Sequence, residues 1–513
     1  MQVLKELTHI VTKEKVRALE LLGFPFSRDD SQARALYMKI LGEEFESDEM
    51  AAQALFGTDK PESNYRKLKS DLFKRLVNAL FFINIKKSKY NTRQLAYHEC
   101  YKNWAASKIL SGKNAKESSI FLTQKVLKYA EEFEFTHLCM DACKALRLHY
   151  GSIIGDSKLY EEYNQKYKDY AALYHQESIA EEYYTDLVIE HIKNKSLKSN
   201  VKEKAIQYYD ALKPALRQWS SHDLHFYGNL IRLIIYTSVN DYKNAISVCE
   251  EAIRFFDRKI YTARMPLIGF NYQKIICNIQ LREFDEKDSS LHLMKKAKFL
   301  EEGTYNWYKF QEVYIILRLH TQRYQAAFDI YSAAVRHKRF QYLPPDRQEY
   351  WKILEKYLHY LALVNKIEPT GNKEYFSKFR LGRFLNETPI FSKDKKGVNI
   401  AILIIQILFL MQQNRWSETV DRIDSIEKYA ERYLHNNYTI RAYYFIKMLL
   451  LLPKNQFHRE AITRKTTQYL QQLKSHSPEF STESSHVEII PFEDMWDMLL
   501  ENLGRQFVNV PSN

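Results

Sequence analysis

His137, Cys139 and Cys143 are the residues of this sequence that come closest to a metal site, in the stretch FTHLCMDACKALRLHYG. Cysteines four residues apart share one face of a helix, where they could supply two of the four ligands that zinc takes. No second pair of ligand residues stands at a suitable spacing, and free cysteines are among the most commonly buried residues. We therefore interpret Cys139 and Cys143 as core residues and expect no bound metal.

Enzyme classes with a short sequence signature find no match. The sequence contains no GxxxxGK[ST], GxGxxG, HExxH, GxSxG or CxxC. It therefore lacks the minimal residues of a phosphate-binding loop, a zinc protease or a nucleophile elbow. Carboxylates such as Glu181 and Glu182, or Glu190 beside His191, could be assembled into an acid–base pair, but charged helix surfaces produce such pairs constantly. We expect no catalytic residues and no cofactor, and an enzyme or metal protein is the third hypothesis for the function.

A cluster of basic residues is a further chemical signal. Residues 63–108 contain eleven Lys or Arg and two acidic residues, in a chain with a net charge of +13. Basic residues on one helix face could neutralise the phosphates of a nucleic acid, although the solvated outer face of a scaffold hairpin has the same composition, and we favour the scaffold hairpin. The candidate nucleic-acid contacts are Arg66, Lys67, Lys69, Lys74, Arg75, Lys86, Lys87 and Lys89.

Five tyrosines form the best-defined aromatic pattern. In KLYEEYNQKYKDYAALYHQ they follow one another at spacings of 3, 4, 3 and 4 residues, which puts all five on one side of a single helix. Exposed rings could stack on bases or hold a peptide. Helix packing alone requires the same spacing, so we favour a core seam. The tyrosines of this seam are Tyr160, Tyr163, Tyr167, Tyr170 and Tyr174.

The elements that position these residues are predicted to be helices. Thirteen glycines in 513 residues are far fewer than the roughly 7% of an average protein. So few glycines leave little room for tight hairpins and bulges, and twelve prolines are spread thinly among runs rich in Leu, Lys, Glu, Ala and Gln. The sequence therefore predicts an all-α fold.

The basic cluster begins in a predicted helix hairpin. Ser47 is suited to cap the start of a first helix, and Gly57 is suited to end it in the left-handed conformation. A second helix follows a proline-containing turn. Leu68, Leu72 and Leu76 mark its inner face, so most of the basic residues fall outside that face.

Residues 34–76 resemble the DNA-binding head of the antibiotic regulatory protein family. In that family an apolar helix leads to a Ser-x-Glu-x-x-Ala-x-x-Leu-Trp-Gly helix, and a basic recognition helix follows a proline-containing turn. The family's wing hairpin finds no clear counterpart in VNALFFINIKKSKYN. The resemblance implies a regulator that binds DNA through residues 34–89. The matching positions are Ser47, Glu49, Ala52, Leu55, Phe56 and Gly57.

A recurring phrase predicts the architecture of the rest of the chain. NDYKNAISVCEEAI (240–253) and QRYQAAFDIYSAAV (322–335) align without gaps, and in each an aromatic residue precedes small residues three and ten positions later. Small residues seven apart lie on one helix face and let two helices approach closely. NRWSETVDRIDSI (414–426) is a looser third copy, and REFDEKDSSLHLMKKA (282–297) is a fourth with three extra residues.

These phrases, each after an apolar helix and a short polar turn, resemble the second helix of a tetratricopeptide repeat, with long and irregular spacing. The resemblance covers about residues 205–450. It implies an α-solenoid of antiparallel helix pairs, whose extended surface binds other macromolecules. A generic helical bundle is the alternative architecture.

Breaks in the pattern divide the chain into seven predicted segments. The expected interruptions are a charged stretch, a stretch with prolines and glycines, and a Ser-rich stretch. The segments are an N-terminal region with the basic hairpin (1–110), a helical segment with the tyrosine seam (111–204), tetratricopeptide-like repeats (205–365), an irregular connection (366–397), further helical repeats (398–473), a flexible linker (474–486) and a C-terminal capping or docking helix (487–513).

The C-terminal segment is predicted to be an amphipathic helix that starts near Pro491 and ends at Gly504. A single helix of about a dozen residues is marginal in water, so it must dock on something. We expect it to cap the last helix pair of the solenoid, and the groove of a partner is the alternative. Its apolar stripe consists of Phe492, Met495, Trp496, Leu499 and Leu503.

Three further features concern the cellular compartment. The run VNIAILIIQILFLM (398–411) is too short to span a bilayer and predicts a helix buried on all sides. The five scattered cysteines are typical of reduced intracellular thiols, and the amino terminus has no apolar signal segment. We expect a cytoplasmic bacterial protein without membrane association, acting as a non-enzymatic scaffold or adaptor for a protein partner. A DNA-binding regulator, with nucleic acid as the partner, is the alternative.

Overall fold

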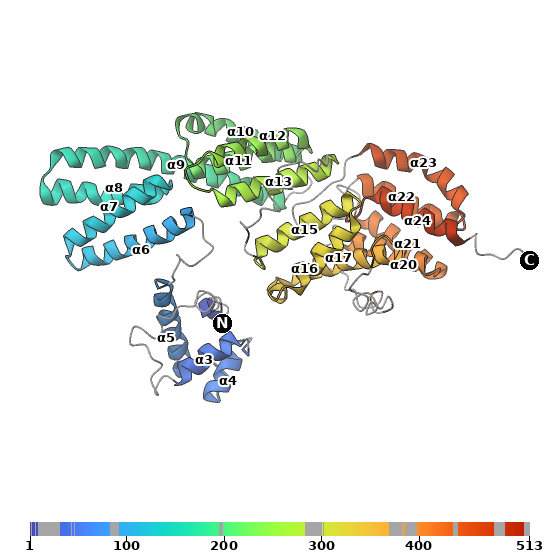
Figure 1. Cartoon of the computed structure of the whole chain (residues 1–513), viewed down its shortest axis with the longest axis horizontal. Helices are drawn as coiled ribbons and strands as arrows, with labels where there is room; N and C mark the ends of the chain where they lie inside the picture. Colours follow the sequence, from blue (N-terminus) through green and yellow to red (C-terminus); the bar gives the residue numbers. More distant parts are fainter. Residues whose placement is uncertain are drawn as a thin grey trace, which may run out of the picture. The chain divides into compact units, whose positions relative to one another are not determined.

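The computed structural model of the chain describes residues 1, 3–5, 7–8, 31–42, 44–45, 47–82, 92–193, 198–282, 300, 302–368, 382, 384, 398–433, 440–476 and 488–506. Within these ranges every regular element is a helix and none is a strand, which confirms the all-α prediction. The chain divides into two compact units, Met1–Tyr174 and His175–Asn513 (Figure 1). The boundary between them falls inside the long helix α9.

The first unit begins with a head of three helices, followed by a run of longer ones that ends in α9. The elements are α3 (Ser31–Leu41), α4 (Asp48–Phe56), α5 (Ser63–Leu80), α6 (Thr92–Gly112), α7 (Lys116–Glu132), α8 (Thr136–Leu148), the π-helix η3 (His149–Ile154) and α9 (Ser157–Lys193).

The head encloses a small core of its own. Helix α4 begins and ends as predicted, because the Ser47 hydroxyl accepts a hydrogen bond from the amide of Met50 and Gly57 has a φ of 71°. Leu72 and Leu76 of α5 are buried, and Leu68 packs against the same core. The predicted inner face of this helix is therefore confirmed.

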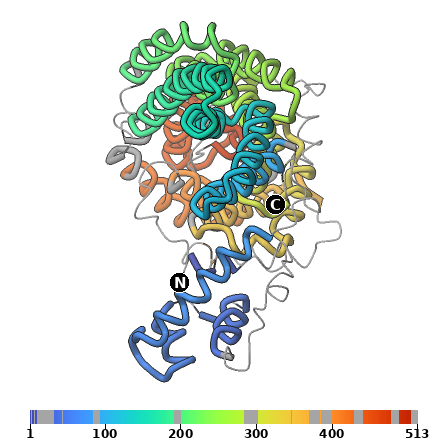
Figure 2. Tube along the Cα trace, turned by 90° about the vertical axis from the view of Figure 1, so that its left-hand side faces the viewer, coloured from blue at the N-terminus to red at the C-terminus, as the bar shows by residue number. Residues whose placement is uncertain are grey.

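The second unit continues from α9 as a series of helices that pack in sequence order. Helices α10 to α13, for example, lie side by side (Figures 1 and 2). The elements after α9 are α10 (Lys198–Gln218), α11 (His222–Thr237), α12 (Tyr242–Asp257), α13 (Arg264–Leu281), α15 (Tyr305–His320), α16 (Tyr324–Arg336), the 3₁₀ helix η4 (Phe340–Tyr342), α17 (Pro345–Leu363), α20 (Val398–Gln412), α21 (Trp416–Tyr433), α22 (Ile440–Lys454), α23 (Arg459–Ser475) and α24 (Phe492–Gln506).

One kind of turn recurs between these helices. The first helix ends with a non-glycine residue in the left-handed conformation, and the amide of the next residue donates a hydrogen bond to the carbonyl five positions back. The following helix starts one residue later. This is the Schellman arrangement, which satisfies carbonyls that the helix end would leave without a partner. The left-handed residues of five such turns are Asn114, Glu134, Asn240, Gln322 and Asn414.

Three of the four predicted repeat phrases form helices α12, α16 and α21, each after an apolar helix and one of these turns. Their small residues are fully buried, as close helix packing requires. The fourth phrase, residues 282–297, lies almost entirely outside the described residues. The fully buried small residues are Ala245, Ala252, Ala327, Ala334 and Thr419.

A continuous hydrophobic core runs from α13 to α24, with Trp351, Phe409 and Trp496 among its buried members. The apolar run 398–411 forms α20 and contributes buried residues on several sides, as predicted. Among the described helices, none is both long and apolar enough to cross a membrane.

The charged stretch that the sequence predicts as an interruption spans residues 193–204, but Lys193 is the last residue of α9 and residues 198–204 belong to α10. Most of the predicted connection 366–397 and of the linker 474–486 lies outside the described residues. The division into seven segments stays a prediction.

Candidate interaction surfaces

Four aromatic side chains form a row across α6, α8 and α9 in the first unit. The ring centres of Tyr97 and Tyr101 are 4.5 Å apart, His137 is 5.7 Å from Tyr101, and Tyr174 is 6.5 Å from His137. The hydroxyl of Tyr101 and Nε2 of His137 share a hydrogen bond. We call these four residues the aromatic row.

The aromatic row has a rigid base beneath Tyr97. Its ring meets the buried ring of Phe135 edge-on, with the centres 5.3 Å apart. The guanidinium of Arg93 covers Phe135 at 4.8 Å and donates a 3.0 Å hydrogen bond to the carbonyl of Phe133. Tyr97 and Tyr101 nevertheless remain 47% and 38% exposed. Burial and the neighbouring Tyr97 hydroxyl raise the pKa of Tyr101 above its ordinary value, so its hydroxyl stays protonated.

The predicted tyrosine seam lies on the single helix α9 and packs against α7, α8 and η3. Tyr163 stacks on Tyr150 with ring centres 5.5 Å apart. The guanidinium of Arg147 lies 4.2 Å from the centre of Tyr167, and Tyr170 donates a 3.1 Å hydrogen bond to Glu131. The two end members, Tyr160 and Tyr174, are 39% and 41% exposed. The seam thus combines a packing face with an exposed edge.

Asp48 lies at the centre of the hydrogen bonds in the head. Its carboxylate accepts bonds of 2.7 Å from the Tyr65 hydroxyl and 2.8 Å from Lys69, and the amino group of Met1 is 3.3 Å away. These bonds lower the pKa of Asp48, although burial opposes the shift. Lys69, a candidate phosphate contact, therefore joins α5 to α4.

The other described candidates of the basic cluster lie along the outside of α5. Arg66, Lys67 and Lys74 are exposed, Arg75 is half-buried, and Lys74 is 4.0 Å from Asp71. Three candidate contacts fall outside the described residues: Lys86, Lys87 and Lys89.

The predicted apolar stripe of α24 is buried within the chain itself. Helix α24 packs against α20, α22 and α23, and the ring of Phe492 stacks on Phe445 at 4.5 Å. The helix continues through Gly504 to Gln506, so the predicted end at Gly504 is wrong; a glycine costs a helix only about 1 kcal/mol, which packing elsewhere on α24 can offset. The buried residues are Phe492, Met495, Trp496, Leu499 and Leu503.

A buried ionic network fixes the start of α24. The guanidinium of Arg441 on α22 lies 2.6 Å from a carboxylate oxygen of both Glu488 and Glu493. Arg282, at the end of α13, adds a second ion pair to Glu493 at 2.8 Å. His320 of α15 bonds the carbonyl of Glu488 at 3.1 Å. Residues of three separate helices therefore hold this segment.

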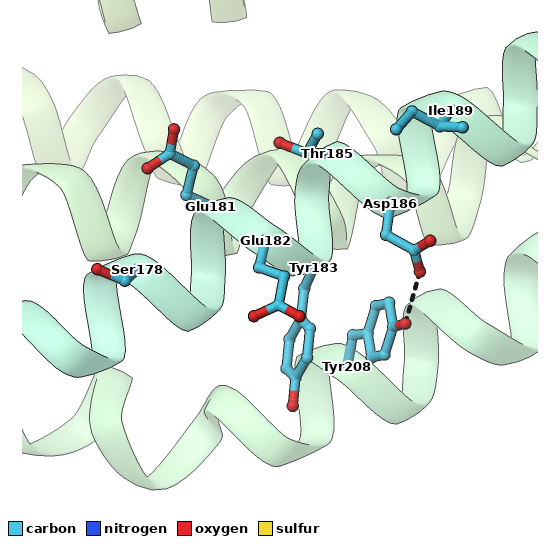
Figure 3. A pocket seen from close by; sticks show the side chains of 8 residues that line it. All are labelled: Ser178, Glu181, Glu182, Tyr183, Thr185, Asp186, Ile189 and Tyr208. Atoms are coloured by element: carbon cyan, nitrogen blue, oxygen red, sulfur yellow. Dashed lines mark hydrogen bonds between the residues drawn. The ribbon is translucent and has the colours of Figure 1, made fainter.

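A surface pocket in the second unit lies between α9 and α10 (Figure 3). Tyr183 stacks on Tyr208 with ring centres 4.0 Å apart, and Tyr208 donates a 2.6 Å hydrogen bond to Asp186. Lys204 pairs with Asp186 at 2.7 Å and with Glu190 at 2.9 Å. Lys204 therefore neutralises part of the negative charge at this pocket. The lining consists of Ser178, Glu181, Glu182, Tyr183, Thr185, Asp186, Ile189 and Tyr208.

The cysteines are buried, as predicted. Burial raises the pKa of Cys143 to about 12 and also raises that of Cys139, so both thiols stay protonated at neutral pH. A protonated thiol is a poor nucleophile. Among the described residues, no group of three or more His, Cys, Asp or Glu has the geometry to hold a metal ion.

Two of these arrangements escaped prediction from the sequence. Tyr97 and Tyr101 are four residues apart on one helix, but nothing in the sequence places them beside His137. Arg441 is near the start of an apolar helix, IRAYYFIKMLLLLP, where a charged residue among apolar ones is a sign of a buried partner. The sequence does not show that Glu488 and Glu493 are those partners.

The chain matches no protein-family model, no curated protein and no solved structure.

Proposed function

We propose that this protein is a non-enzymatic scaffold or adaptor of the cytoplasm, built as a tetratricopeptide-like α-solenoid of antiparallel helix pairs. The observation that supports it is the repetition of one structural unit. In α11–α12, α15–α16 and α20–α21 an apolar helix, a Schellman turn and a helix with buried small residues follow in the same order. The helices of these repeats pack mainly against the helices next to them in the sequence, as expected of a solenoid.

A binding role follows from what such a fold offers. The side chains that neighbouring helices leave exposed form an extended surface without a catalytic centre. The aromatic row is a part of that surface where large side chains remain exposed over a rigid base. Exposed aromatic side chains of this kind are typical of protein-binding sites.

Affinity purification tests the scaffold proposal. The full chain, tagged and expressed at its natural level in the native host, is cross-linked briefly, purified and analysed by quantitative mass spectrometry. We expect one or a few proteins to co-purify in near-stoichiometric amounts and to be absent from a tag-only control. Recovery of the chain alone, in repeated cross-linked samples, contradicts the proposal.

A DNA-binding regulator is the second candidate, favoured by the geometry of the head. The bonds between Asp48 and Lys69 join α4 to α5, and the outside of α5 presents Arg66, Lys67 and Lys74 to solvent. A helix held in this way with basic residues on its outer face could enter a DNA groove. Lys69 would support DNA binding indirectly, because its bond to Asp48 holds α5 against α4.

A gel-shift assay at low salt, with genomic fragments of the host as the probe, tests the second candidate. If the head binds DNA, each replacement of Arg66, Lys67 or Lys74 by Gln lowers the slope of log affinity against log salt by about one. Lys113→Gln, an exposed lysine between α6 and α7, is the matched control and leaves the slope unchanged. A wild-type protein that shifts no fragment rules the regulator out.

A further inference from the structure

Tyr97 and Tyr101 differ in their electrostatic surroundings from two other exposed tyrosines. Tyr305 and Tyr443 are exposed to a similar degree, but Lys309 and Lys447 lie 5.8 Å and 5.5 Å from their ring centres. A Lys or Arg side chain of this chain also lies over the rings of four other tyrosines: Tyr163, Tyr167, Tyr208 and Tyr209.

Tyr97 and Tyr101 have no such cover. In the part of the chain that the structure describes, no Lys or Arg lies over either ring. The guanidinium of Arg93 is stacked on Phe135, whose ring meets Tyr97 edge-on, and is bonded to the carbonyl of Phe133. The exposed parts of the Tyr97 and Tyr101 rings are therefore not covered by a described cation of this chain.

A carboxylate lies on α8, the helix that contributes His137 to the aromatic row. Asp141 follows His137 by one helical turn of α8, so both residues lie on the same face of that helix. Burial and the neighbouring tyrosines raise the pKa of Tyr101 most, and the charge of Asp141 is the smallest of the influences that raise it. Asp141 is half-exposed and forms no ion pair with another described residue, including Lys144 one turn further along.

We propose that the aromatic row, together with Asp141, binds an arginine or lysine side chain in an unstructured basic segment of a partner protein. The cation would lie over the rings of Tyr97 and Tyr101, where the negative faces of the ring systems attract it. Asp141 would be its counter-ion at the edge of the row. This inference rests on the proposed scaffold function and adds the chemistry of one partner.

The same groups argue against two other kinds of ligand. A nucleic acid could stack bases on the tyrosines, but its phosphates would be repelled by Asp141 and would meet the guanidinium of Arg93 already engaged below the row. A proline-rich peptide would use the rings and gain nothing from the carboxylate. Only a cationic side chain uses both.

Peptide binding by the full chain tests the inference. The probe is a fluorescein-labelled nonapeptide, Gly-Ser-Gly-Arg-Arg-Arg-Gly-Ser-Gly, followed by fluorescence anisotropy at low salt. Reference peptides replace the arginines with glutamine or with proline, and oligo(dT) is the nucleic-acid reference. Because the chain has a net charge of +13, general electrostatics disfavour the arginine peptide, and tighter binding of that peptide reports a local site.

Three variants distinguish the contribution of the aromatic ring, the contribution of the carboxylate and the effect of replacing any exposed tyrosine. Tyr97→Leu keeps an apolar side chain but removes the aromatic face, and Asp141→Asn removes the charge with little change in shape. We expect each to weaken binding of the arginine peptide about two- to fivefold, as is usual for exposed cation–π and ion pairs. Tyr305→Leu, at an equally exposed ring that Lys309 covers, is the matched control and leaves binding unchanged. Thermal melting confirms that each variant is folded.

Two results overturn the inference: the arginine peptide binds no more tightly than the glutamine, proline or oligo(dT) references, or both variants bind it as the wild type does. Affinity purification of the Tyr97→Leu, Asp141→Asn double variant distinguishes this failure from failure of the scaffold function. If the wild type and the double variant recover the same partners at the same level, the scaffold stands and the basic-segment site does not. Loss of one partner from the double variant supports the site.

Discussion

Arg441 on α22 and Glu493 on α24 form a buried ion pair across 52 residues of sequence, with two hydrogen bonds of 3.0 Å and 2.6 Å. Their side chains are 1% and 8% exposed. Burial of Glu493 would raise its pKa, but Arg441 holds it below the usual value. Glu488 binds the same guanidinium, and Arg282 forms a further ion pair with Glu493, so two guanidinium groups balance two carboxylates.

Replacement of this guanidinium should therefore be strongly destabilising. In Arg441→Met, two buried carboxylates lose their main partner, a change that costs about 3–5 kcal/mol in comparable buried pairs. Urea unfolding followed by circular dichroism measures the loss as a lower midpoint for the transition of the second unit. Arg459→Met, at an exposed position on α23, is the control and should stay within about 0.5 kcal/mol of the wild type. A loss below about 1 kcal/mol for Arg441→Met would show that the network does not hold α24.

Removal of residues 487–513 should expose the core that α24 covers. Phe492, Met495, Trp496, Leu499 and Leu503 are all buried, and each contributes about 1.5–3 kcal/mol of burial free energy, on the order of 10 kcal/mol in all. This is comparable with the whole stability of a typical domain. We expect the truncated chain to aggregate or to melt at a much lower temperature. A soluble truncated protein with the wild-type melting temperature would refute the capping role and make α24 the first place to look for a partner site.

Acidification should destabilise the second unit partly through His359. Burial lowers the pKa of His359 to about 4 against the ordinary 6.5, although Glu355 at 4.0 Å opposes the shift, while Lys356 adds to it. The unfolded chain therefore binds more protons between pH 6.5 and 4, so the stability is complete above pH 6.5 and falls as the pH decreases through this window.

His320, whose pKa burial also lowers, contributes with the same sign. His359→Gln should reduce the loss of stability between pH 7 and pH 5, measured by urea unfolding at a series of pH values. His175→Gln, at an exposed position on α9, is the control and should keep the wild-type slope. Parallel curves for His359→Gln and the wild type would contradict this assignment.

Local patterns in the sequence were enough to predict the helices and several of their ends. The cap at Ser47, the left-handed Gly57 and the buried small residues of α12 and α16 each depend on a few neighbouring residues. The aromatic row and the network at Arg441 depend on contacts between residues from 36 to 211 positions apart. Such contacts are set by the packing of whole helices, which a residue spacing within one helix cannot reveal.

The low glycine content predicts the helices but does not show how the turns between them are made. The sequence correctly predicts helices from it, but the helix turns still require left-handed residues, and this chain uses asparagine, glutamine and glutamate at several of these positions. Asparagine tolerates this conformation better than other non-glycine residues. An asparagine two residues before a helix start is therefore a turn signal, which VNDY and QNRW share.

Asn114, in the turn between α6 and α7, provides a direct test of this role. Its φ is 60°, and the amide of Ala115 closes the turn on the carbonyl of Leu110 at 3.0 Å. Asn114→Ala should cost the first unit about 1 kcal/mol, because a Cβ without a local hydrogen-bonding group is disfavoured in the left-handed region. Asn114→Gly should be neutral or slightly stabilising, since glycine adopts this conformation without steric cost. Urea unfolding of both variants measures the difference, and equal stability of the alanine and glycine variants would show that the left-handed turn is not formed in solution.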